Sequence, residues 1–175
     1  MYIDTAGYGT ELLFKNGLHL VPYKSEDKKQ SEEIFAAIKS VLVDTKISDL
    51  DFIAVITGPG SFTGIRLGLS ISKGFKIATN VPVFGIDRFK AVSISQGRTG
   101  RISLFAGNGE VYFADIGANG EFLGPQELSK GEPDADTAID PKAVLEYIEN
   151  EFEKGTDPGH LAPLYIKPHY AQIPK

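Results

Sequence analysis

The residues with the clearest chemical potential form a glycine-rich corner, Thr57-Gly58-Pro59-Gly60-Ser61-Phe62-Thr63-Gly64. An apolar run over 52–57 precedes it and a helical pattern follows, so the sequence predicts a strand, a tight turn and a helix. Such a corner presents backbone N–H groups and a positive helix end to an anion. However, its spacing is one residue too long for a dinucleotide-binding turn, and no P-loop lysine follows. We expect a corner shaped for helix packing, with a phosphate site at Gly58, Gly60 and Ser61 as the alternative.

Two other kinds of chemistry have less support in the sequence. Ser61 lies at the sharp turn, but its neighbours do not form the Gly-x-Ser-x-Gly elbow of serine hydrolases. The histidines His19, His160 and His169 form no helical pair, and the chain has no cysteine. The common zinc-ligand patterns are therefore missing. We expect neither a catalytic metal nor peptidase activity.

The helix that follows the corner carries small residues on one face. Gly64, Gly68, Ser72 and Phe75 recur at helical spacing, and Leu67 and Ile71 add an apolar stripe. Each interior glycine costs about 0.5–1 kcal/mol relative to alanine, so this face needs a close packing partner. A helix that is apolar nearly all round is buried on two sides. We expect one side to meet the chain's own sheet and the other a second protein.

The surrounding patterns predict an α/β protein of two unequal parts. In the first part, strands are expected over 1–5, 10–14, 18–23, 52–57 and 81–86, with helices over 27–43, after the corner, and from Asp87 to Gln96. In the second part, strands are expected over 101–106, 110–116 and 121–128, before a helix with Asp140 as cap and Pro141 at its first position. We predict an N-terminal lobe over 1–97, a shortened C-terminal lobe over 101–155, and a Pro-rich tail over 156–175 that packs back on a lobe.

Composition restricts the partners of the chain. There are 18 Lys and Arg residues against 23 Asp and Glu residues, which is the opposite of the basic surplus of a protein that grips RNA alone. Asp4 interrupts the N-terminus before a signal-peptide core can form, and no run has membrane-spanning length. The sequence predicts a cytoplasmic protein that makes no membrane contact and does not grip RNA on its own.

The run GPGSFTGIRLGLSISKGFK over 58–76 resembles the hallmark of the TsaB (YeaZ-type) family, accessory proteins of bacterial tRNA threonylcarbamoyladenosine synthesis. Supporting matches are Asp4-Thr5, Gly109-Glu110-Val111-Tyr112 and Pro163-Leu164-Tyr165-Ile166-Lys167-Pro168, so the resemblance touches both halves of the chain. It implies a two-lobed, actin-like and ribonuclease-H-like fold with mixed sheets and helices. The second lobe would be abbreviated.

The resemblance also implies a degenerate nucleotide site. Actin-like enzymes hold Mg²⁺ through water on an acidic residue after the first strand, a place taken here by Asp4, with Gly7 in the next turn. Phe105 stands where relatives often carry an Asp, and the first helix lacks the His-x-x-x-His pair of the catalytic relatives. We expect Asp4, Gly7, Gly58, Gly60 and Ser61 to be a vestige, with no cofactor unless ATP or ADP binds at a partner interface. An autonomous ATPase of the superfamily is the alternative, and a glycoprotease-like peptidase is a weaker one.

By the same resemblance, the chain would be a non-catalytic scaffold. Its expected partners are the catalytic subunit TsaD, the ATPase TsaE through that heterodimer, and a second copy of itself in isolation. It would meet tRNA only indirectly. We expect the pairing surface on the first two helices, with the partner approaching over Gly64 and Gly68. The predicted interface residues are Ile34, Ile38, Val41, Leu42, Gly64, Leu67, Gly68, Ile71 and Phe75.

Overall fold

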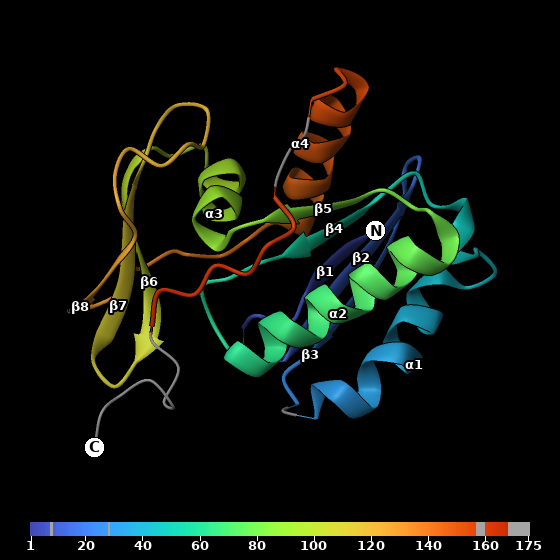
Figure 1. Cartoon of the computed structure of the whole chain (residues 1–175), viewed down its shortest axis with the longest axis horizontal. Helices are drawn as coiled ribbons and strands as arrows, with labels where there is room; N and C mark the ends of the chain where they lie inside the picture. Colours follow the sequence, from blue (N-terminus) through green and yellow to red (C-terminus); the bar gives the residue numbers. More distant parts are fainter. Residues whose placement is uncertain (8, 28, 157–159, 168–175) are drawn as a thin grey trace.

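The computed structural model describes residues 1–7, 9–27, 29–156 and 160–167 of the 175-residue chain. Within these residues the chain forms a five-stranded sheet, a three-stranded sheet and four α-helices. Figure 1 shows the two sheets at opposite ends of the molecule, with the last described segment, in red, running between them. The mixed sheets and their helices confirm the predicted two-part α/β, actin-like architecture.

The larger sheet is mixed, with strand order β3-β2-β1-β4-β5. An antiparallel meander forms its first half: β1 (Tyr2–Asp4), β2 (Thr10–Asn16) and β3 (His19–Ser25). Two parallel strands follow, β4 (Ile53–Ile56) beside β1, and β5 (Val83–Ile86) at the edge. Because β1, β4 and β5 run in the same direction, the turns that follow them meet at one end of the sheet.

Helices cover both faces of this sheet. The helices α1 (Gln30–Leu42) and α2 (Phe62–Thr79) lie on one face of the sheet. On this face, the side chains of Ile3 and Val55 would lie within 4 Å of a Cβ atom on Gly68. Lys15 projects from the opposite face, because side chains alternate along a strand, and it pairs with Glu149 of α4 (Pro141–Glu153). Figure 1 shows α4 lying apart from the α1 and α2 layer. A short 3₁₀ helix, Ile47–Asp49, precedes β4.

The smaller sheet is an antiparallel meander packed on one helix. Its strands are β6 (Gly100–Gly107), β7 (Glu110–Ile116) and β8 (Glu127–Lys130), and its helix is α3 (Arg88–Gln96). Phe89 and Val92 of α3 are completely buried against Ile102 of β6. The Phe89 ring also meets the edge of Phe122 at 6.0 Å. The second core is thus small and depends strongly on α3.

Several predicted boundaries are found, and others are shifted. Asp87 caps α3 by accepting a bond from the N–H of Lys90 at 2.9 Å, and Asp140 caps α4 by accepting one from Lys142 at 2.9 Å. The strand predicted over 121–128 was placed too early, because residues 117–121 form a turn and only Phe122 makes an isolated bridge to Ile116. The helix predicted over 27–43 begins at Gln30.

One predicted boundary is wrong in a way that matters for the fold. The predicted C-terminal lobe over 101–155 included α4, but Val144, Leu145 and Ile148 of α4 belong to the first core. The far face of the five-stranded sheet is apolar and has to be covered, and α4 is the helix that covers it. The second part of the chain therefore completes the first lobe as well as forming the smaller sheet.

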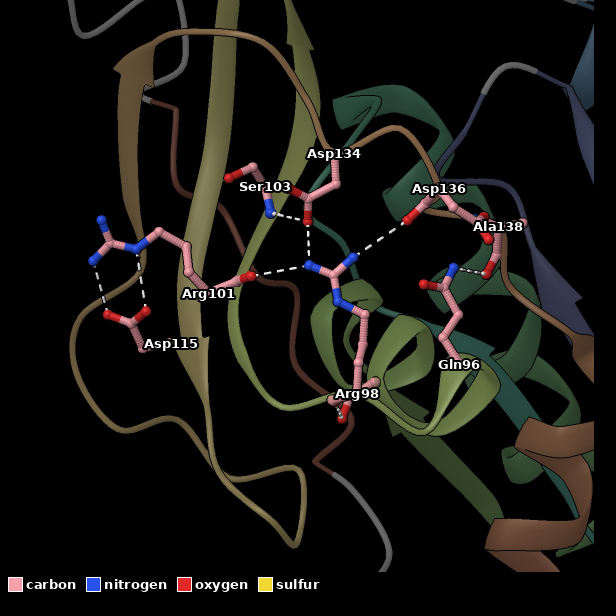
Figure 2. Close-up of polar contacts among 9 residues, drawn as sticks. Gln96, Arg98, Arg101, Ser103, Asp115, Asp134, Asp136 and Ala138 are labelled. Atoms are coloured by element: carbon pink, nitrogen blue, oxygen red, sulfur yellow. Dashed lines mark hydrogen bonds and ion pairs between the residues drawn. The ribbon is translucent and has the colours of Figure 1, made fainter.

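A polar network ties the loop between β8 and α4 to the smaller sheet. Figure 2 shows the Asp134 carboxylate accepting bonds from the Arg98 guanidinium and from the Ser103 N–H, the latter at 3.0 Å. Arg98 also donates to the carbonyl of Arg101 at 3.0 Å. The loop thereby occupies the free edge of β6, which would otherwise leave its hydrogen-bonding groups unpaired.

Substituting Asp134 tests this network. Asp134→Ala leaves both the Arg98 guanidinium and the Ser103 N–H without their shared acceptor, so the free energy of unfolding should fall by about 1–3 kcal/mol. Chemical denaturation measures this change. Asp115→Ala, which removes the exposed partner of Arg101 on the same sheet, is the matched control and should change little. Equal losses in the two variants would contradict a special role for Asp134.

Candidate functional site

The glycine-rich corner is held against the turn after β1. The Ser61 N–H donates to the carbonyl of Ala6 at 2.7 Å, and the Ser61 hydroxyl caps α2 by accepting a bond from the Gly64 N–H at 3.2 Å. At Gly60, where φ is +158°, a Cβ atom would overlap the Ala6 carbonyl. Two of the N–H groups that a phosphate at this corner could use, those of Ser61 and Gly64, are therefore already bonded within the chain. The Ser61 hydroxyl is likewise committed to the helix cap.

Residues 160–167, called here the strap, cross the carboxyl ends of β4 and β5. The Leu164 N–H donates to the carbonyl of Thr57 at 2.8 Å. A Cβ atom on Gly58 would lie 2.7 Å from the Leu164 carbonyl oxygen, and one on Gly85 would overlap the carbonyl of His160. These two glycines leave room for the strap, which runs on from the first core at Leu161 to the second at Leu164 and Ile166.

The strap is also attached to the start of α2. The Tyr165 ring packs on Phe62 with centroids 5.0 Å apart, and the Arg66 guanidinium lies 3.9 Å from the Phe62 centroid. Arg66 Nε donates to the Tyr165 hydroxyl at 3.3 Å. At the far end of the strap, Lys167 Nζ pairs with Glu110 of β7 at 2.6 Å. Side-chain contacts of the strap therefore connect α2, which packs on the larger sheet, to the smaller sheet.

A cavity of about 680 Å³ opens between the corner, the strap and the smaller sheet. Gly7, Gly60 and Ser61 line it, whereas Asp4 and Gly58 are not among its lining residues. The proposed vestige of a nucleotide site is thus only partly brought together. The remaining lining residues are Ala6, Pro59, Phe62, Thr63, Arg88, Leu104, Phe105, Ala106, Gly107, Asn108, Tyr112, Thr137, Leu164, Tyr165, Ile166 and Lys167.

Several ionisable groups of the larger sheet and of the start of α3 are partly or fully buried. Asp4 is 8% exposed and accepts a bond from the Ala6 N–H at 2.7 Å. Glu11 is its cross-strand neighbour, and burial raises the pKa of the Glu11 carboxyl although Lys24, 3.7 Å away, counteracts part of the shift. Burial also raises the pKa of the Tyr2 hydroxyl well above its usual value, and that of the Asp87 carboxyl. Among the described residues, no group of three or more His, Cys, Asp or Glu side chains is arranged to hold a metal ion.

The predicted interface residues of α1 face the sheet. Ile34, Ile38, Val41 and Leu42 are all buried in the first core. The outward positions of this helix and its end are instead Phe35, which is 61% exposed, and Val43, which is 67% exposed. The apolar periodicity of α1 therefore marked its packing against the sheet.

The small face of α2 also points inward, so this part of the prediction is wrong. A Cβ atom on Gly64 would overlap the Thr5 carbonyl, and one on Gly68 would lie 2.6 Å from the Thr5 hydroxyl oxygen. The close approach that these glycines allow is to β1 and the turn after it. Ile71 is buried in the same layer, and Leu67 and Phe75 are partly buried against it.

The outward side of α2 contains residues that the sequence analysis did not select. Ile77 is 84% exposed, and a Cβ atom on Gly74 would meet nothing within 4 Å. We define the outer face of α1 and α2 by Phe35, Val43, Gly74 and Ile77. The i, i+3 spacing of Gly74 and Ile77 is present in the sequence. The sequence analysis selected the opposite face because the longer repeat of Gly64, Gly68 and Ser72 lies there.

No α-helix in the described part of the chain is long and apolar enough to cross a membrane.

Comparisons with known proteins agree on one family. Residues 20–129 match the family model described as TsaD, tRNA N6-adenosine threonylcarbamoyltransferase. The tRNA threonylcarbamoyladenosine biosynthesis protein TsaB of Buchnera aphidicola subsp. Schizaphis graminum is 30% identical over 103 residues, which cover 55% of this chain and 49% of that protein. TsaB of Escherichia coli K12 is 27% identical over 123 residues, covering 65% and 52%. The chain therefore spans about half the length of these relatives.

The fold has solved counterparts. A Pseudomonas aeruginosa protein described as similar to the peptidase YeaZ superposes with a TM-score of 0.72 over 95% of this chain and 98% of that one. The two chains share 16% sequence identity, so this likeness concerns the fold alone.

Proposed function

Because this chain belongs to the TsaD family and is a TsaB-type (YeaZ-type) member of it, we propose that it serves tRNA N6-threonylcarbamoyladenosine biosynthesis as a non-catalytic scaffold. Its partner would be a TsaD-type threonylcarbamoyltransferase, which supplies the catalytic groups. The observation that carries this proposal is the outer face of α1 and α2.

This face exposes apolar side chains on regular helices. Three of its side chains are each more than half exposed: Phe35, Val43 and Ile77. Neither helix needs them for packing on the sheet. Scattered exposed apolar residues are ordinary, but large ones on the outward side of one helical layer are typical of interaction sites. Lys39 and Lys73 on the same outward sides would form the polar rim of such an interface.

Gly74 gives independent support to an interface at this place. It lies inside α2 without a positive φ, and the space around its missing Cβ is open. Glycine in a helix interior costs about 1 kcal/mol relative to alanine, and the packing of this chain does not explain why it is present. A partner helix lying close to α2 would explain it, because a small residue allows two backbones to approach.

The corner favours a scaffold over an autonomous ATPase. The Ser61 and Gly64 N–H groups are bonded within the chain, and the strap lies against Gly58. Any ATP or ADP of the reaction would then bind at the seam between the partners. The pair would recruit TsaE as a third protein and meet tRNA through TsaD, and without TsaD the chain would self-associate through the outer face.

Substituting Ile77 tests the proposal. Ile77→Lys places a charge in the middle of the outer face, and because the side chain is 84% exposed the fold should be unaffected. We expect the affinity for the TsaD-type protein of the same organism, measured by isothermal titration calorimetry, to fall at least about tenfold. Threonylcarbamoylation of tRNA by the reconstituted system should fall with it.

Leu18 provides the matched control. It is 102% exposed, on the turn between β2 and β3, and is not one of the residues that define the outer face. Leu18→Lys should leave the calorimetric affinity and the tRNA modification unchanged. If Ile77→Lys binds as tightly as the unmodified chain, the outer face is not the interface. If the purified chain alone hydrolyses ATP and loses this activity in Asp4→Ala, the autonomous enzyme is correct.

A further inference from the structure

The cavity between the two sheets is suited to a small ligand, independently of the proposed partner. Its volume of about 680 Å³ lies in the range of typical small-molecule sites, roughly 300–1,000 Å³. Leu104 and Tyr112 form its wall on the smaller sheet, while Phe62, Leu164 and Ile166 close it on the side of α2 and the strap. Such a lining favours an apolar or aromatic ligand body.

The charges around the cavity are all of one sign. None of its described lining residues is an Asp or a Glu, although the chain as a whole has 23 acidic residues and a net charge of −5. The cationic lining residues are Arg88 and Lys167, and Lys167 already pairs with Glu110. Arg88 is therefore the cationic lining residue that is in none of the ion pairs between described residues.

Arg88 lacks an anionic partner within the described part of the chain. Its backbone N–H donates to the carbonyl of Gly58 at 2.7 Å, which fixes the residue at the start of α3. Its Nε atom is buried with no hydrogen-bond partner, and the guanidinium is in none of the ion pairs. The residue as a whole is partly exposed, but a buried N–H of a permanently protonated guanidinium that has no acceptor is costly.

The nearby acids do not fill this role. Asp4 is bonded to the Ala6 N–H, and Glu11 interacts more strongly with Lys24 than with Arg88. Among the charges that lower the pKa of Glu11, Arg88 has the smallest effect. An anion in the cavity would supply the counter-ion that these acids do not.

The anion is better matched by a carboxylate than by a phosphate. A phosphate site needs several converging N–H donors, but those of Ser61 and Gly64 at the corner are already used. A single planar guanidinium, in contrast, can bind one carboxylate through two parallel hydrogen bonds. The cavity thus combines one such donor group with apolar walls.

We propose that this cavity binds a small monocarboxylic acid with an aromatic or branched apolar body. The carboxylate pairs with Arg88, and the body lies between Leu104 and Tyr112 on one side and the strap on the other. The ligand would bridge the two sheets and so hold them in one arrangement.

Three probes with the same phenyl ring and different polar groups test the proposal: phenylacetate, its neutral isostere phenylacetamide, and phenyl phosphate. Each is titrated into the full chain while amide and methyl resonances are followed by NMR. We expect phenylacetate to bind at least tenfold more tightly than phenylacetamide, with the largest shifts at Leu104 and Leu164. In Arg88→Gln this preference should disappear, while Arg101→Gln, on the far side of the smaller sheet, should keep it.

Each outcome of this experiment is decisive. Equal affinity for phenylacetate and phenylacetamide, or no saturable shift at the cavity residues, would overturn the proposal. Tighter binding of phenyl phosphate than of phenylacetate would overturn it in favour of a phosphate site. The comparison of the three probes uses the unsubstituted chain, so it remains valid even if Arg88→Gln fails to fold. If the unsubstituted chain does not bind TsaD, the proposed function is refuted, but the result for the cavity is not affected.

Discussion

Replacing Gly64 by alanine is expected to destabilise the chain by about 3 kcal/mol or more, although the change adds a single methyl group. The added Cβ atom would overlap the Thr5 carbonyl oxygen, which is backbone and cannot rotate away. The Thr5 hydroxyl also donates to the Gly64 carbonyl at 2.6 Å, so any shift of α2 would lengthen that bond. Overpacking of this kind typically costs about 1–3 kcal/mol, and more where backbone has to move. Thermal unfolding should show a midpoint lower by about 10 °C.

Gly74→Ala in the same helix is the matched control. The site has open space around the missing Cβ, so alanine should stabilise the isolated chain by about 0.5–1 kcal/mol through its helix propensity. The two glycines therefore have opposite predicted effects, although they lie ten positions apart in one helix. A Gly64→Ala chain that melts at the same temperature as the unsubstituted chain would show that α2 does not lie against Thr5 as described.

Replacing Phe89 by alanine is expected to cost about 3–5 kcal/mol, with the effect concentrated in the smaller sheet. The ring is completely buried and meets Phe122 edge to face. Phe→Ala changes in cores cost this much because they remove apolar burial and leave a cavity. The second core is small, so it has little capacity to close around the gap. The rate of amide hydrogen exchange should therefore increase more in β6 and β7 than in β4.

Phe35→Ala is the control for this prediction. That ring is 61% exposed on α1, so its removal should leave exchange in both sheets nearly unchanged. Uniform acceleration across β4, β6 and β7 in Phe89→Ala would contradict the separation of the two cores. Far-UV circular dichroism would confirm that the variant retains its helices.

Much of the fold could be predicted because local signals were strong. Asp140 caps the helix for which it was proposed, and Asp87 caps the helix that was predicted to start there, since a short polar side chain before an apolar helical repeat has few other roles. The strand, corner and helix over 53–79 likewise followed from residue types alone. Local chemistry was sufficient in these places.

The site could be predicted only in part, because it depends on contacts between distant segments. The sequence showed that Gly64 and Gly68 need a close neighbour, but not that this neighbour is Thr5 of the same chain. The room left by Gly58 and Gly85 for the strap depends on where residues 160–164 return. Arg88 carried no signal at all, since a single arginine at a helix start is ordinary until its surroundings are known.

The position of α4 has a consequence for how the protein is made. Its residues 141–153 cover the far face of a sheet whose strands all come from the first 86 residues. While the chain is being synthesised, that apolar surface stays open to water until α4 has left the ribosome. Folding of the first half is therefore completed late, and a nascent chain stalled before α4 would be a natural target for chaperones.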